Sequence, residues 1–418
     1  MKKLVSIIFS LMVISIIIFN FTFCSKLKPS NLKANYHLKK ANKYYSEEKY
    51  RKAISEYEEA LKFNPDLKIA YLYLGTSYAM MYKPGRETEK NKMYAEKAKE
   101  YLLKAKEVDP DNEKIDIALG DLFDKMGDFE GAEKHYLAIL ERKPKDPKTY
   151  YILANFYSKY GKDKLAVSMY EKRIELEPEN PEGYLYLANF YQDRRMWDEA
   201  IANHYKRIFV LTDKSILDLQ NEIEKLQKNI ERVNKIKKVM TPVLKNKAIT
   251  DIDGVPREEW IKQKEEELKQ LGTIKEIEAK IENLKKELEN RIAENEKKML
   301  NLDKDLKKEL AVAYYTLGVV YWNKSYQTRP EFMGPKERNI VIENGLHVLE
   351  VSSKLDPTYP EPWAYVSLLY REKLKVDPKN RDKYLAEAKK YSEKFNQLRK
   401  RKLQSEQFMK ELEKMGKE

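Results

Sequence analysis

The feature that most constrains the fold is a pattern that recurs every 34 residues, in repeats that begin at Glu113, Pro147 and Pro181. Each repeat has a small residue at its eighth position, an aromatic residue at its eleventh and alanine at its twentieth. These are Gly120, Ala154 and Ala188, then Phe123, Tyr157 and Tyr191, then Ala132, Ala166 and Ala200. Apolar positions recur at helical spacing in both halves of each repeat. The pattern therefore predicts stacked pairs of antiparallel helices.

The repeated side chains explain how such pairs pack. Small residues at positions eight and twenty let two helices approach closely, and the aromatic side chains fill the space beside them. Pro144 and Pro178 close their repeats, because proline disfavours helix at the residue before it. One helix pair cannot bury its own apolar face, so neighbouring pairs must stack into a solenoid.

Four further repeats, three of them less regular, extend the array on both sides. The first begins at Ala34 and keeps the same offsets, with Ala41, Tyr44, Ala53, Tyr57, Ala60 and Pro65. The second begins at Lys68, and roughly a dozen extra residues near Pro84 lengthen the turn between its helices. The sixth and seventh are more divergent, and their matching positions are Tyr314, Leu317, Gly318 and Tyr321, then Gly345, Leu349 and Pro357, then Trp363 and Tyr370.

These recurring residues resemble those of the tetratricopeptide-repeat family. The resemblance implies an all-α fold, a right-handed superhelix of about seven helix pairs. We expect five repeats in residues 34–214, and two divergent repeats with a final helix in residues 311–410. Members of the family hold other proteins in the groove of the superhelix, so the resemblance also implies protein binding without enzymatic activity.

The repeat pattern is interrupted in residues 215–310, where a heptad seam replaces it. The seam follows one helix with Ile216, Leu219, Ile223, Leu226, Ile230 and Val233, and a second with Ile274, Ile277, Ile281, Leu284, Leu288, Leu302 and Leu306. Pro242, Asp253–Gly254 and Pro256 are expected to end the first helix and reverse the chain. We expect a long coiled-coil helical hairpin that protrudes from the solenoid. The alternative is a parallel coiled coil between two copies of the chain, because a seam does not show which helix it faces.

The first 24 residues have the pattern of a targeting segment. Lys2 and Lys3 precede an almost wholly apolar run, residues 4–23, which ends at Cys24. This resembles a bacterial lipoprotein signal, in which the cysteine is acylated and tethers the mature protein to a membrane, although Phe23 replaces the small residue that usually precedes it. The alternatives are an uncleaved anchor helix that spans a ~30 Å hydrocarbon core and a cleaved signal that releases the protein. All three place the rest of the chain outside the cytoplasm.

No arrangement of side chains in the sequence predicts catalysis, a metal site or a cofactor. The four histidines are far apart and Cys24 is the single cysteine, so the spacings of metal ligands are missing. Residues 251–254 lack the further acidic ligands of a calcium loop and are predicted to form a turn. The 81 Lys and Arg residues are interspersed with 68 Asp and Glu residues, which argues against a nucleic-acid-binding surface.

The candidate site is the groove that the first helices of the repeats would line. The family resemblance implies ligand-facing residues at positions two, five, nine and twelve, which here include Asn42, Tyr45, Asp121, Lys148, Tyr151, Asn155, Ser158, Asn189 and Gln192. Asparagine at position nine suits a peptide backbone, because an amide both donates and accepts hydrogen bonds. Its alternative role is a hydrogen bond between the helices of adjacent repeats. Position five is mostly apolar, which argues against a clamp for a terminal carboxylate.

The sequence therefore predicts a membrane-tethered scaffold outside the cytoplasm of a bacterial cell, with peptide segments of other proteins as its partners. Envelope lipoproteins of the family act in assembly or secretion, and the resemblance implies such a role here. The alternative is a structural spacer or homo-oligomerisation protein that acts through its coiled coil.

Overall fold

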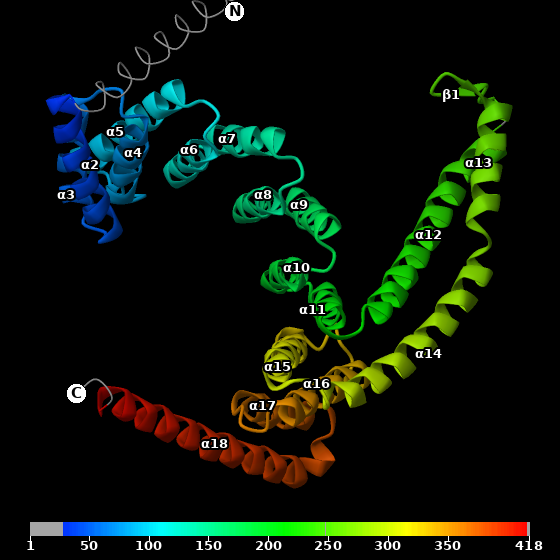
Figure 1. The fold of residues 1–418 in the computed structure, drawn as a ribbon. Helices are drawn as coiled ribbons and strands as arrows, with labels where there is room; N and C mark the ends of the chain where they lie inside the picture. Colours follow the sequence, from blue (N-terminus) through cyan, green and yellow to red (C-terminus); the bar gives the residue numbers. More distant parts are fainter. Residues whose placement is uncertain (1–27, 247, 416–418) are drawn as a thin grey trace, which may run out of the picture. The chain divides into compact units, whose positions relative to one another are not determined.

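The computed structural model describes residues 28–246 and 248–415, which are mostly helical (Figure 1). The predicted signal or anchor, with Cys24, lies outside the described residues. The chain divides into two compact units between Leu176 and Glu177. Within the described residues, no helix combines the length and the apolar character needed to cross a membrane.

The first unit consists of helix pairs in its described part. Its helices are α2 (Pro29–Ser46), α3 (Tyr50–Phe63), α4 (Lys68–Met81), α5 (Glu89–Val108), α6 (Glu113–Met126), α7 (Phe129–Arg142), α8 (Pro147–Lys159) and α9 (Asp163–Leu176). Helices α2 and α3, α4 and α5, α6 and α7, and α8 and α9 pack against each other as pairs, and each pair also packs on the next one along the chain. One pair corresponds to one sequence repeat.

The ends of these helices follow from their local sequence. The side chains of Asn112 and Asp146 accept hydrogen bonds from the backbone N–H groups of Lys114 and Lys148, and so cap the first turns of α6 and α8. Gly127 ends α6 with a φ of 78°. This left-handed conformation is one that glycine adopts without steric cost.

Glycine at position eight is required by the close approach of the paired helices. A Cβ atom on Gly120 would lie 2.5 Å from Cε1 of Tyr136 on α7, and one on Gly75 would lie 2.7 Å from Cγ of Leu102 on α5. Tyr136 and Leu102 both stand at position 24 of their repeats. The small residue of the first helix therefore faces a large residue of the second, as the sequence pattern predicts.

The second repeat accommodates its extra residues in a loop and a longer second helix. The loop spans residues 82–88, and α5 then extends over 20 residues. Asn91, which is buried, fastens the loop to this helix. Its Oδ1 accepts a hydrogen bond from the backbone N–H of Lys83, and its Nδ2 donates to the carbonyl oxygens of Lys83 and Arg86.

The second unit combines three helix pairs with the insert. Its elements are α10 (Pro181–Asp193), α11 (Trp197–Thr212), α12 (Lys214–Lys245), β1 (Asp251–Ile252), β2 (Val255–Pro256), α13 (Arg257–Leu271), α14 (Ile274–Met299), α15 (Lys304–Gln327), α16 (Pro335–Leu355), α17 (Glu361–Val376), a short 3-10 helix (Pro378–Asn380) and α18 (Arg381–Met415). Helix α15 packs against α11. The fifth and sixth repeats therefore stack on each other although the insert separates them in the sequence.

The insert folds back on itself within the chain. Helix α12 packs against both α13 and α14, and Ile223, Ile277 and Ile281 are buried between α12 and α14. Ion pairs join Glu222 to Lys280 at 2.7 Å and Arg232 to Glu267. Residues later in α12 thus pair with residues earlier in the segment formed by α13 and α14. Helix α12 therefore runs antiparallel to that segment.

Two helix boundaries of the insert differ from the predicted ones. Pro242 lies inside α12, which continues to Lys245. This proline is exposed and stands in the last turn, so only one hydrogen bond is lost there and the free carbonyl groups can reach water. The returning helix does not continue through Leu302 and Leu306, because α14 ends at Met299 and Asp303 starts α15 by accepting hydrogen bonds from two backbone N–H groups.

Residues 251–254 form the turn that the sequence predicts. Strands β1 and β2 pair in antiparallel register, with Ile252 opposite Val255. Asp253 and Gly254 connect them with φ values of 53° and 81°. Positive φ at both central residues is the geometry of the tight hairpin turn that Asp-Gly favours.

Candidate protein-binding pocket

A pocket of about 260 Å³ lies on the first unit, where the first helices of three successive repeats meet. Two of the predicted site residues, Tyr45 on α2 and Asp121 on α6, line the same pocket. Helix α4 lies between them in the repeat order and supplies Leu72, Tyr73, Thr76, Ala79 and Met80. The positions that the family resemblance implies are thus brought together here by three repeats.

The interior of the pocket is aromatic and held in place by packing. The rings of Tyr45 and Tyr73 meet edge to face, with centroids 5.2 Å apart. Tyr73 also stacks on the fully buried Tyr57 at 6.2 Å. Leu72 is only 3% exposed. An apolar side chain of a ligand would therefore meet surfaces that are already ordered, which lowers the entropic cost of binding.

The charged residues that line the pocket are Lys114, Asp121 and Lys125. All three are exposed on α6. Two ammonium groups and one carboxylate give this part of the pocket a net positive charge. The Asp121 carboxylate is already engaged, because Oδ1 accepts a hydrogen bond from the hydroxyl of Tyr136 at 2.7 Å.

This tyrosine bond to position nine recurs in three repeats of the first unit. Tyr57 bonds to Oδ1 of Asn42 at 2.7 Å, and Tyr170 bonds to Oδ1 of Asn155 at 2.8 Å. A carboxylate can only accept, so at Asp121 the tyrosine hydroxyl must be the donor. The two asparagines likewise accept the bond at Oδ1, and both residues are exposed. The hydrogen bond joins the two helices of one repeat, not adjacent repeats as the alternative interpretation supposed.

The remaining predicted residues, Asn42 on α2 among them, do not line this pocket. Lys148, Tyr151, Asn155 and Ser158 lie on α8 of the first unit, where Tyr151 packs under the guanidinium group of Arg173 at 5.2 Å. Asn189 and Gln192 lie on α10, in the second unit.

Several lining residues were not among the predicted ones. Leu72, Thr76 and Lys114 occupy positions five, nine and two of their repeats, so the same positional rule would have found them if it had been applied to every repeat. Tyr73, Met80 and Lys125 occupy positions six and thirteen. No rule of the family resemblance points to those two positions.

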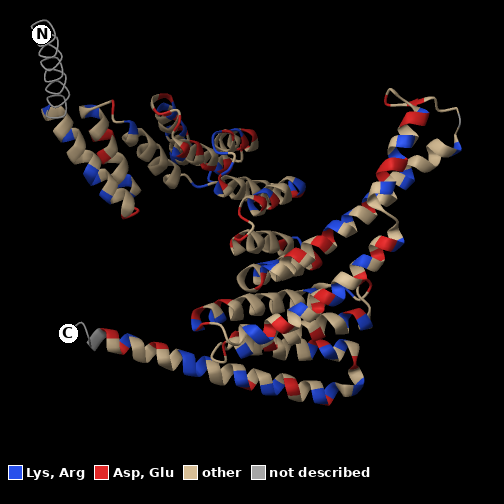
Figure 2. Cartoon of the chain, turned by 45° about the vertical axis from the view of Figure 1, so that its right-hand side comes forward, with Lys and Arg blue, Asp and Glu red and all other residues tan. Residues whose placement is uncertain are grey.

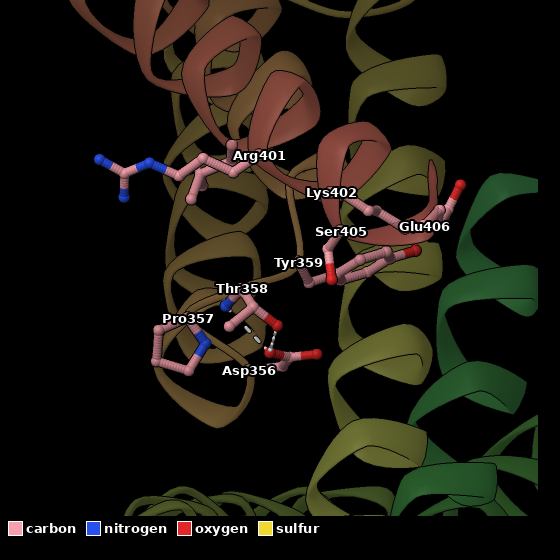
Figure 3. A pocket seen from close by; sticks show the side chains of 9 residues that line it. Asp356, Pro357, Thr358, Tyr359, Arg401, Lys402, Ser405 and Glu406 are labelled. Atoms are coloured by element: carbon pink, nitrogen blue, oxygen red, sulfur yellow. Dashed lines mark hydrogen bonds between the residues drawn. The ribbon is translucent and has the colours of Figure 1, made fainter. Parts of the chain in front are cut away.

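A second pocket lies in the second unit, between α18 and the turn that precedes α17 (Figure 3). Thr358 closes this turn by donating its backbone N–H and its hydroxyl to Oδ1 of Asp356, at 2.9 and 2.6 Å. Arg401 extends away from Asp356 in this view. Lys and Arg residues are interspersed with Asp and Glu residues along the helices of both units (Figure 2). The lining of this second pocket is mixed in the same way and indicates no particular ligand.

Family models match three segments of the chain. The model described as TPR repeat matches residues 41–81, and the model described as tetratricopeptide repeat matches residues 117–146 and 147–180. The chain therefore contains tetratricopeptide repeats. Together with the helix pairs, these matches confirm the predicted all-α solenoid. No curated protein sequence matches the chain.

Solved structures of other repeat proteins are similar over part of the chain. MamA from Desulfovibrio magneticus RS-1 has 15% identity, with 43% of this chain and 93% of that chain covered and a TM-score of 0.34. PilW, a type IV pilus biogenesis factor, has 19% identity, coverage of 42% and 77%, and a TM-score of 0.34. YrrB, a TPR protein with an unusual peptide-binding site, has 18% identity, coverage of 42% and 84%, and a TM-score of 0.31.

Proposed function

We propose that this chain is a protein-interaction scaffold that is tethered to a membrane outside the cytoplasm and holds peptide segments of its partners in the pocket between α2, α4 and α6. The observation that carries the proposal is the convergence of Tyr45, Tyr73 and Asp121 from three successive repeats on one pocket. Assembly or secretion in a bacterial envelope is the proposed setting.

The chemistry of the pocket suits an extended peptide with one apolar side chain. The tyrosine rings and Leu72 offer an apolar surface, and burial of such a side chain contributes about 25 cal/mol per Å². Lys114 and Lys125 favour acidic residues beside that anchor. A protein that only binds such a peptide segment of its partner needs no catalytic group.

The proposed tether is the acylated Cys24, which follows the apolar run of residues 4–23. Cys24→Ser should move the protein from the membrane fraction to the soluble fraction and remove the mass of the attached lipid. An unchanged membrane fraction, with the N-terminal residues still present by mass spectrometry, would instead indicate an uncleaved anchor. Release of the wild-type protein into the soluble fraction would contradict both forms of tethering.

The binding function is tested by a crosslinking pull-down from native membranes. Thr76→Arg places a long charged side chain in the pocket without removing a core residue, and it should abolish capture of the partners. Ser46→Arg is the matched control, because Ser46 is exposed on α2 and does not line the pocket. Partner recovery that survives Thr76→Arg would contradict the proposal. A parallel Tyr151→Ala and Asn155→Ala variant tests whether α8 contributes as well.

A spacer or oligomerisation role remains a second candidate because the insert has its own exposed apolar side chains. Val239 and Leu244 on α12 are 44% and 50% exposed, and α13 has no buried residue. The seam between α12 and α14 is already filled within the chain. Replacement of residues 214–302 by a short linker leaves α15 free to pack on α11. The second candidate would be favoured if this deletion variant loses self-association or its partners while the Thr76→Arg variant keeps them.

A further inference from the structure

The loop between α15 and α16 forms a pocket of about 410 Å³ against the end of α17. Three of its lining residues are cations: Arg329, Arg338 and Lys375. None of the residues that line it is acidic. Pockets of this size are typical of small-molecule sites.

Arg338 is held in the wall of this pocket as a fixed, buried cation. It is only 5% exposed. One terminal nitrogen donates to the carbonyl oxygen of Ser325 and the other donates to that of Thr328, the latter at 2.7 Å. These carbonyls belong to the C-terminal end of α15, whose partial negative charge stabilises the guanidinium group. Two carbonyl bonds use only part of the five N–H donors of arginine.

Of the three cations that line the pocket, only Lys375 has a carboxylate partner among the described residues. Among the described residues, no carboxylate forms an ion pair with Arg329 or Arg338. Lys375 pairs with Glu372 at 2.7 Å, yet the lysine side chain is 49% exposed, and its ammonium group also lies 5.0 Å from the ring centre of Tyr326. Arg329 and Arg338 are therefore the two lining cations without a carboxylate partner, and the carbonyl oxygens of Ser325 and Thr328 stabilise Arg338.

The start of α16 adds to the same field. Pro335 is the first residue of this 21-residue helix and lines the pocket. The preceding N-cap residue, Gly334, has no side chain to cap the helix. The partial positive charge of a helix N-terminus attracts anions, and Pro335 places this N-terminus at the lining of the pocket.

We propose that this pocket binds a phosphate group, carried either by inorganic phosphate or by a small phosphomonoester. A phosphate monoester has a charge of about −1.5 to −2 at neutral pH. It matches a lining with two guanidinium groups and a lysine better than a single carboxylate does, and the exposed fork of Arg329 can bind its oxygens in pairs. Met333, which is 3% exposed, and Val376 give the pocket an apolar wall that can contact the organic part of an ester.

The test is titration of the full-length protein with inorganic phosphate, and separately with phenyl phosphate, followed by calorimetry at low ionic strength. Trp322, which stacks on Tyr326 at 5.1 Å, supplies a second readout through its fluorescence. We expect saturable binding of phosphate and no binding of acetate at matched ionic strength. Tighter binding of phenyl phosphate would identify the ester as the source of the group, and equal affinity would identify the free ion.

Three variants distinguish a built site from diffuse attraction. Arg329→Gln and Lys375→Gln should each weaken phosphate binding by about tenfold. Lys336→Gln removes the same charge next to the pocket without altering its lining, and it should change the affinity less than twofold. Arg338→Lys keeps the charge but loses the fork, and circular dichroism would show whether it remains folded. No saturable phosphate binding by the wild type, or an equal effect of Lys336→Gln, would overturn the proposal.

Discussion

The two units differ at the position where the second helix of a repeat faces the first. In the first unit, Tyr57, Tyr136 and Tyr170 occupy position 24 and each bonds to the residue at position nine. In the fifth repeat, which lies in the second unit, His204 takes this position and is 1% exposed. Within the described residues, neither of its ring nitrogens has a hydrogen-bond partner. Position 24 thus has a hydrogen-bonded side chain in three repeats of the first unit. In the fifth repeat it has a buried side chain without a hydrogen-bond partner among the described residues.

This difference determines how each unit responds to acid. Burial, and secondarily the charge of Arg207, lowers the pKa of His204 to about 4. The first unit instead buries a carboxylate, Asp116, with hydrogen bonds from Lys106, His135 and Arg142. Burial alone would raise the pKa of Asp116, but these three donors lower it below its usual value. Both shifts make stability depend on pH: the His204 contribution is lost between about pH 6.5 and 4, and the Asp116 contribution is lost only in stronger acid, as the pH falls below the usual pKa of the carboxyl.

The largest expected effect is the loss of the Asp116 carboxylate. Asp116 is completely buried, and Asp116→Ala would leave three cationic or potentially cationic groups without their common partner. We expect the first unit to lose about 3–5 kcal/mol of its free energy of unfolding. Urea denaturation gives the total, and hydrogen exchange should localise the loss to α5, α6 and α7. Glu113→Gln, which removes an exposed pair with Lys143, should cost less than about 1 kcal/mol.

The second prediction concerns the acid response of the second unit. The unfolded state takes up a proton on His204 near pH 6.5, whereas the folded state takes it up only near pH 4. The contribution of His204 to stability is therefore complete above pH 6.5 and falls as the pH decreases toward 4, by about 3 kcal/mol in total. Urea denaturation at several pH values measures this slope.

A single substitution separates His204 from other acid-sensitive groups. His204→Tyr should remove the loss between pH 6.5 and 4, because the tyrosine can bond to Asn189 as the other three tyrosines do to their position-nine partners. Ala188 stands at position eight of this repeat just as Ala154 does beside Tyr170, so the ring has the same room. A variant that keeps the wild-type pH slope would show that His204 is not its source.

The third prediction tests the tyrosine bonds of the first unit directly. Tyr136→Phe removes a hydrogen bond to a carboxylate and should cost about 2 kcal/mol. Tyr57→Phe and Tyr170→Phe each remove a bond to a neutral amide and should cost about 1 kcal/mol. Equal costs at all three sites, measured by thermal and urea unfolding, would contradict the assigned role of charge at Asp121.

The smallest effect is expected at the tip of the insert. Gly254 has a φ of 81°, so Gly254→Ala should destabilise the hairpin turn by about 1 kcal/mol, although a Cβ atom would meet no neighbour there. Gly334→Ala is the control, since this glycine has an ordinary φ of −67° and equally open surroundings. Hydrogen exchange at β1 and β2 should increase in the first variant only.

The sequence predicts the parts of the molecule that short-range rules decide. The 34-residue period predicts the helix pairs, the small residues at position eight predict their close approach, and Asp253–Gly254 predicts the turn. It does not show that α12 continues past Pro242, because tolerance of that proline depends on its exposure near the helix end. The end of α14 at Met299 could have been predicted from Asp303, which caps α15. The apolar spacing continues through Leu302 and Leu306, however, and this spacing led to the prediction of one continuous helix.

The candidate site was predicted less completely because it depends on which repeats meet. Positions nine and twelve indicate Asp121 and Tyr45, which both line the pocket, yet the sequence does not show that the two residues share it. Tyr73 and Lys125 stand outside the positional rule and enter the pocket through the packing of α4 and α6. The basic pocket of the sixth repeat also could not be predicted, since the burial of Arg338 depends on the carbonyl groups at the end of α15.

The most direct test of the binding function is a photo-crosslinking amino acid placed at Thr76, inside the pocket, in the full-length protein in its native membrane. The same amino acid at Lys90, an exposed position of α5, is the matched control. We expect the Thr76 probe to crosslink a peptide segment of a partner and the Lys90 probe to crosslink none. Crosslinks of equal yield at both positions, or none at Thr76, would contradict the proposed binding function.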